Sequence, residues 1–167
     1  MEQSGSAAKT TRGRVLGVGI DFLASPENVG TDMAVVVGTM HPGMVIPLHS
    51  HPDPELIYLL DGELKVYLEE AQVSAWKTAR ANELVVIPGN AKHALRAAGN
   101  DACRMLVLTR GELYDFFQEL AEPEEANAPN LPPTPEQMQK TFEAAGRYRY
   151  WMASPAENAA IGLRLEA

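Results

Sequence analysis

The sequence predicts an all-β fold, a sandwich or barrel, followed by a short helical extension. Short runs rich in β-branched and apolar residues follow one another between residues 14 and 110. Turn residues such as His41-Pro42-Gly43 and Asp61-Gly62 separate these runs, and the apolar spacing becomes helical only after residue 110. Many short strands in this rhythm are typical of sandwiches and barrels. A chain of 167 residues is long enough for one domain with a sizeable core.

Nine strands are expected in the barrel core, which we place at about residues 14–110. The dipeptide Asp61-Gly62 between the fourth and the fifth strand is a strong signal for a tight hairpin. The expected strands cover residues 14–20, 32–40, 44–50, 55–60, 63–69, 76–79, 83–87, 92–98 and 104–109.

The extension, residues 111–167, begins with an expected amphipathic helix over residues 111–120. Residues 121–135 hold five prolines and no periodicity, which indicates an extended connector. Thr134-Pro135-Glu136-Gln137 has the residues of a capping box, so a second helix is expected from there to about Ala145, ending at Gly146. An aromatic cluster follows and is expected to pack on the barrel or on a second subunit: Tyr148, Tyr150 and Trp151.

Composition and charge exclude several classes of partner. The formal net charge is -8 and no basic stripe occurs, so nucleic acid and anionic membrane surfaces are poor partners. No apolar run approaches the ~18 residues that span a bilayer. Residues 1–14 are polar, so no secretion signal is expected, and residues 1–10 are expected to be disordered. The single cysteine, Cys103, fits a reducing cytoplasm and is expected to be buried in a strand.

The spacing Gly-(x)5-His-x-His-(x)3-Glu-(x)6-Gly in residues 43–62 indicates a metal site. His49 and His51 are two residues apart, so on a strand both side chains point to one face. Glu55 can join them from the next strand, after Pro52 and Pro54, and Gly62 ends that strand in a turn. Imidazole and carboxylate groups together suit a borderline divalent ion. Another histidine, His41, precedes Pro42-Gly43 and is interpreted as an exposed loop residue.

These five positions resemble the first motif of the cupin superfamily. The second cupin motif is present in part, with Pro88 and His93 in place. Asn90 replaces its central glycine, and asparagine tolerates left-handed backbone angles, so the turn is expected to persist. Asn82 stands at the leading glycine and Ala97 at the final asparagine. The resemblance covers about residues 34–108.

The resemblance implies a double-stranded β-helix, the cupin jelly-roll barrel, with a short helical C-terminal extension. It also implies that a divalent transition metal (Fe, Mn, Ni, Co or Zn) is bound, with the ligands His49, His51, Glu55 and His93. Glu55 has a second possible role, as a catalytic base that stands off the metal. The alternative without metal is that the histidines are hydrogen-bonded barrel residues.

The layout of the extension resembles that of small single cupins related to quercetin dioxygenases. This resemblance implies a metal-dependent oxygenase that acts on a small hydroxy-carbonyl or aromatic substrate. Two alternatives stay open: a redox-neutral isomerase or lyase that uses the same metal as a Lewis acid, and a non-enzymatic cupin that only binds a small ligand. A homodimer formed through the outer strands is expected as well.

Overall fold

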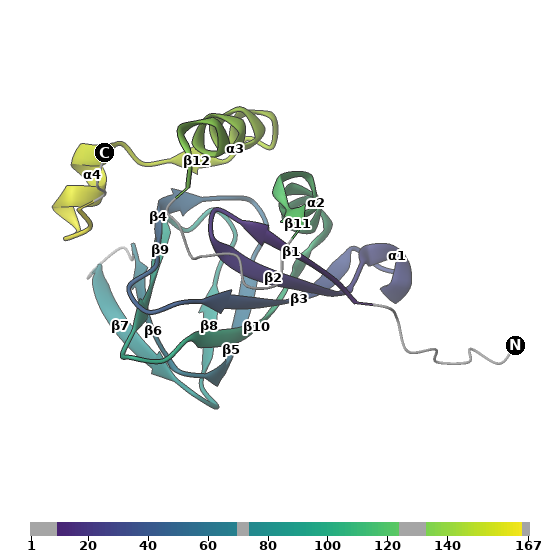
Figure 1. Cartoon of the computed structure of the whole chain (residues 1–167), viewed down its shortest axis with the longest axis horizontal. Coiled ribbons are helices and arrows are strands. Elements are labelled where there is room, and N and C mark those ends of the chain that lie inside the picture. The colour runs from purple at the N-terminus through teal and green to yellow at the C-terminus, as the bar shows by residue number, and fades with distance from the viewer. Residues whose placement is uncertain (1–9, 70–73, 124–132, 165–167) are drawn as a thin grey trace, which may run out of the picture.

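Two antiparallel sheets form the body of the protein (Figure 1). The structure is a computed structural model that describes residues 10–69, 74–123 and 133–164. The seven-stranded sheet has the order β11-β1-β2-β3-β10-β5-β8, and the five-stranded sheet has the order β12-β4-β9-β6-β7. Some neighbours, such as β3 with β10, β10 with β5 and β4 with β9, are far apart in sequence, as in a double-stranded β-helix. This confirms the predicted jelly-roll barrel and its helical C-terminal extension. The expected disordered lead lies outside the described residues, except for Thr10.

The elements follow in chain order. They are β1 (Thr11–Val15), β2 (Val18–Ala24), α1 (Pro26–Val29), β3 (Met33–Met40), β4 (Val45–Ser50), β5 (Glu55–Asp61), β6 (Glu63–Leu68), β7 (Ala75–Arg80), β8 (Leu84–Ile87), β9 (His93–Ala98), β10 (Cys103–Arg110), α2 (Gly111–Leu120), β11 (Glu122–Pro123), α3 (Pro135–Arg147), β12 (Trp151–Met152) and α4 (Pro155–Ala160).

The first predicted strand is wrong, whereas the other eight correspond to β3–β10 within a residue or so. Residues 14–20 do not form one strand, because the chain reverses at Leu16 and Gly17, which have φ values of 48° and 86°. Val15 then pairs with Val18, and the two halves become separate strands of a hairpin. Paired positive φ values are typical of a tight two-residue hairpin turn.

The two predicted helices of the extension are present. α2 has the predicted bounds, and α3 starts with the predicted capping box on Thr134. The predicted end at Gly146 is wrong, since α3 runs on to Arg147. The left-handed residue behind this helix is Arg149, with φ 60°, so Gly146 is not needed to end it. Most of the predicted connector, residues 124–132, lies outside the described residues, while β11 pairs with β1.

The C-terminal aromatic cluster packs on the barrel, which was one of the two predicted alternatives. Tyr150 is buried and its ring lies 4.8 Å from that of Phe116 in α2. Trp151 pairs with Ser50 of β4, so β12 extends the five-stranded sheet. Figure 1 shows α2 and α3 with β12 gathered at one end of the barrel. Within the described residues, no helix is long and apolar enough to cross a membrane.

Candidate metal centre

The two histidine motifs meet through the pairing of β4 with β9. His49 and His93 are direct partners in this register, and their ring centroids lie 4.2 Å apart. The ladder is irregular between Ile46 and His49, and Pro47, which has no N–H to give, lies in this irregular stretch. His51 follows β4 directly, with its ring centroid 5.0 Å from that of His93. Three imidazoles from both motifs therefore converge, close enough to hold one ion.

Backbone hydrogen bonds fix the orientation of all three rings. The Nδ1 atom of His49 lies 2.7 Å from the carbonyl oxygen of Pro47. The Nδ1 atoms of His51 and His93 lie 2.7 and 2.9 Å from the carbonyl oxygens of Asp53 and Ala91. A carbonyl oxygen only accepts, so each Nδ1 carries the hydrogen. In the neutral ring, Nε2 then keeps its lone pair, as a metal ligand requires.

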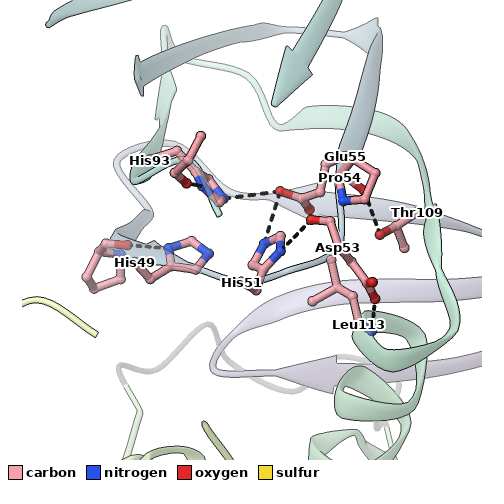
Figure 2. Close-up of polar contacts among 10 residues, drawn as sticks. His49, His51, Asp53, Pro54, Glu55, His93, Thr109 and Leu113 are labelled. Carbon is pink, nitrogen blue, oxygen red and sulfur yellow. Dashed lines mark hydrogen bonds and ion pairs between the residues drawn. The ribbon is translucent and has the colours of Figure 1, made fainter. Parts of the chain in front are cut away.

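Glu55, the first residue of β5, faces two of these rings (Figure 2). Its Oε2 lies 3.2 Å from Nε2 of His93 and 3.6 Å from Nε2 of His51, and Figure 2 marks these two ion pairs with dashed lines. Within the described residues, neither of these Nε2 atoms has a hydrogen-bond partner, and both are buried. Two lone pairs that face a carboxylate are unfavourable unless a cation lies between them, so this donor set fits a divalent metal.

Burial and neighbouring charges shift the pKa values of the site. Desolvation, together with the charges of the neighbouring imidazoles of His93 and His51, lowers the pKa of His49 to about 3. For Glu55, desolvation raises the pKa, but the close imidazoles of His51 and His93 outweigh it, so the pKa falls well below its ordinary value. Desolvation also opposes the charge on His51, yet Glu55 raises its pKa overall. The site thus favours an ionised carboxylate and a neutral His49 at neutral pH.

The turn of the second motif is fastened to the loop of the first. Asn90 has φ 63°, so the predicted left-handed turn is confirmed, and its N–H donates to the carbonyl oxygen of His51 at 2.7 Å. A Cβ atom on Gly89 would lie only 2.2 Å from the carbonyl oxygen of Pro52. This close contact requires glycine. The hydrogen bond from Asn90 and the close approach at Gly89 hold the two segments that carry the predicted ligands against each other.

Comparison with known proteins shows that part of the barrel is similar to a known family. Residues 36–109 match the family model described as "Cupin domain". All four predicted site residues, His49, His51, Glu55 and His93, lie within this matched region. No curated protein sequence matches the chain.

Two oxalate decarboxylases of known structure share the fold of the barrel. The oxalate decarboxylase of Lactobacillus farciminis in a formate complex has a TM-score of 0.55 and 20% identity, over 64% of this chain and 32% of that one. The oxalate decarboxylase of Bacillus subtilis at pH 4.6 has a TM-score of 0.54 and 21% identity, over 64% of this chain and 28% of that one. A structure from work on the DMSP lyases RdDddP and RnDddQII has a TM-score of 0.49 and 28% identity, over 56% of this chain and 47% of that one. The alignment thus spans about a third of the length of the decarboxylases.

A mainly apolar cavity of about 140 Å³ adjoins the predicted metal ligands. His49, His51 and Glu55 form its polar side. Residues outside the matched region, on the extension, supply another part of its wall: Leu113, Phe116, Phe117, Thr141, Tyr150 and Met152. The extension therefore completes a ligand-sized space that the barrel alone leaves open.

The sequence analysis missed two polar residues beside this site. Asp53 is buried, and its carboxylate accepts from the backbone N–H of Leu113 at 2.7 Å, as Figure 2 shows. The sequence signal that could have found Asp53 is its position within the first metal motif, between Pro52 and Pro54. Tyr150 is also buried, with its ring centroid 5.3 Å from that of His51. Desolvation raises the pKa of Tyr150 well above the ordinary value, so the phenol is neutral. His41 is exposed, as predicted.

Proposed function

We propose that this chain is a metal-dependent oxygenase that acts on a small hydroxy-carbonyl or aromatic substrate. The observation that supports this most is the junction of three oriented imidazoles with an apolar cavity. The proposed metal ligands are His49, His51, His93 and Glu55. The proposed metal is a divalent transition metal: Fe, Mn, Ni, Co or Zn. The fold is compatible with such an ion, since Mn(II) centres occur in the oxalate decarboxylase of Bacillus subtilis.

The cavity supports a substrate about the size of one aromatic ring. Its volume is about 140 Å³, and an engineered apolar cavity of about 150 Å³ binds benzene. A three-ring flavonol such as quercetin exceeds this space. Among the described residues that line the cavity there is no Arg or Lys, so a small dianion such as oxalate has no cationic partner there. A monocyclic compound with two adjacent oxygen atoms fits both the apolar wall and the polar side.

The protein groups have separate roles in this proposal. The bound metal supplies Lewis acidity and a template for the reactants. The three imidazoles hold it through Nε2, because their Nδ1 atoms are bound to the backbone. Glu55 either completes the ligand set or accepts the proton of a substrate hydroxyl, since it lies at the cavity in its ionised form. The apolar wall orients the ring and excludes water.

A homodimer is part of the proposal, and its contact face is the outer side of the seven-stranded sheet. One apolar row crosses four neighbouring strands of this sheet, in the order Val35, Leu108, Leu56 and Val86. The next row contains the paired residues Tyr58 and Leu84. Leu56, Leu84 and Val86 are 38%, 55% and 53% exposed.

Charge also points to this face. The ion pairs Arg104–Asp61 and Arg110–Asp32 compensate the charges beside the apolar rows. A chain with a net charge of -8 repels a second copy elsewhere, so a neutral apolar face favours self-association.

The buried thiol of Cys103 is in keeping with the expected reducing cytoplasm.

Elemental analysis of the purified protein by inductively coupled plasma mass spectrometry tests the metal site. We expect near-stoichiometric transition metal in the wild type and in His41→Ala, which removes an exposed histidine. We expect its loss in the double variant His49→Ala/His93→Ala. Equal metal in the double variant and the wild type would show that the site is wrongly assigned.

Oxygen uptake by the metal-loaded protein, with catechol and 2-hydroxyacetophenone as probes, tests the reaction class. Oxygen consumption coupled to loss of the probe supports the oxygenase. Turnover without oxygen consumption assigns the site to a redox-neutral isomerase or lyase. Binding without turnover assigns the chain to the ligand-binding cupins.

A further inference from the structure

Tyr150 belongs to the buried core, yet its hydroxyl has the properties of a ligand-binding group. It is 8% exposed and lines the cavity, between the ring of His51 and the ring of Phe116. Its hydroxyl oxygen is buried and has no hydrogen-bond partner among the described residues. A buried hydroxyl left unpaired costs about 1–3 kcal/mol, so such a group in a native protein requires an explanation.

The rest of the cavity wall is chemically different from Tyr150. Apart from the predicted metal residues, the wall is almost entirely aliphatic or aromatic. The one other hydroxyl in it, on Thr141 of α3, donates to the carbonyl oxygen of Gln137 at 2.8 Å and is satisfied within its own helix. Within the described wall, the Tyr150 hydroxyl is thus a buried donor without a partner.

We propose that Tyr150 is the specificity-determining residue of the cavity, and that its hydroxyl donates a hydrogen bond to an oxygen atom of an aromatic ligand. This inference deepens the proposed function, on which its catalytic meaning rests, although ligand selection by Tyr150 requires no metal. The barrel then holds the metal, and the extension distinguishes oxygenated rings from plain hydrocarbons. A site built around a hydrogen bond rejects the analogue that lacks the polar group, because the donor is left unpaired.

Binding of phenol and of benzene to wild type and to Tyr150→Phe, measured by isothermal titration calorimetry, tests this inference. The variant keeps the ring and its packing but removes the donor. We expect phenol affinity to fall by about 3- to 10-fold and benzene affinity to stay within about twofold, since one neutral hydrogen bond is lost. The ligand-free variant is expected to unfold at the same temperature as wild type or at a higher one, because an unpaired buried hydroxyl is gone.

Tyr148→Phe is the matched control. Tyr148 lies next to Tyr150 with ring centroids 5.7 Å apart, yet it is not part of the cavity wall. We expect this variant to bind both probes as wild type does. An unchanged ratio of phenol to benzene affinity in Tyr150→Phe would overturn the inference, and so would a wild type that binds neither probe.

Metal analysis of the same samples separates the two proposals. Loss of phenol selectivity in Tyr150→Phe, with no metal in any sample, supports Tyr150 and removes the proposed oxygenase. Bound metal with unchanged selectivity removes the role of Tyr150 and keeps the metal site.

Discussion

The carboxylate of Asp53 caps helix α2 from across the fold, by accepting the backbone N–H of Leu113 at 2.7 Å. The residue at the N-cap position, Arg110, makes no side-chain cap of its own. The carbonyl oxygen of the same Asp53 accepts from Nδ1 of His51 at 2.7 Å. One buried residue thus joins the start of the C-terminal extension to a predicted metal ligand.

Asp53→Ala is expected to lower the free energy of unfolding by about 1–3 kcal/mol, because the N–H of Leu113 loses its partner in a buried place. Urea denaturation checks this. Asp53→Asn keeps an acceptor oxygen and is expected to lose less. Glu112→Ala removes an acid from the same helical turn without removing the cap, and serves as a second control. A loss below about 0.5 kcal/mol in Asp53→Ala would contradict the assigned role of the cap.

Gly62→Val is expected to destabilise the protein far more than Gly99→Val. Both glycines have positive φ values, 77° and 78°, so both variants carry backbone strain. At Gly62, however, a Cβ atom would lie 2.7 Å from the carbonyl oxygen of Ala102, whereas nothing lies within 4 Å at Gly99. The additional loss at Gly62 should be about 1–3 kcal/mol, as for overpacking, measured by thermal or chemical denaturation. Equal losses would mean that the chain does not approach Gly62 closely.

The strands and the histidine site could be predicted from the sequence because both depend on short spacings. Period-two alternation and glycine turns marked β3–β10, and His49, His51 and Glu55 lie within one motif. The failures come from context. The run around Leu16-Gly17 looks like a single apolar strand until its backbone angles are known. Asp53 meets a partner 60 positions away, and Tyr150 reaches the cavity only through packing of the extension.

Val86→Glu is expected to convert a dimer into a monomer. Val86 is 53% exposed and lies on the edge strand β8, in the apolar rows of the proposed contact face. Two copies that meet there would bury the new carboxylates without partners. Light scattering coupled to size-exclusion chromatography gives the mass. Phe142→Glu alters an equally exposed apolar residue of α3, 51% exposed, and should leave the mass unchanged. A monomeric wild type would rule out this face.

Above pH 9, Cys103 is expected to make stability depend on pH. Burial raises the pKa of its thiol from 9.0 to about 11. Between these values the unfolded chain releases the proton while the folded chain keeps it, so stability falls as pH rises from 9 to 11. The slope is at most about 1.4 kcal/mol per pH unit. Denaturation of wild type and Cys103→Ala over this range isolates the effect, and parallel curves would contradict it.

The pairing of His49 with His93 has a consequence for how the protein fails under stress. An ion held by both residues would bridge two segments that lie far apart along the chain, and it would have to leave before β4 and β9 separate. The lifetime of the folded state would then depend on metal release, a kinetic rather than an equilibrium property. Chelators would accelerate unfolding at a fixed temperature, even where the unfolding midpoint changes little.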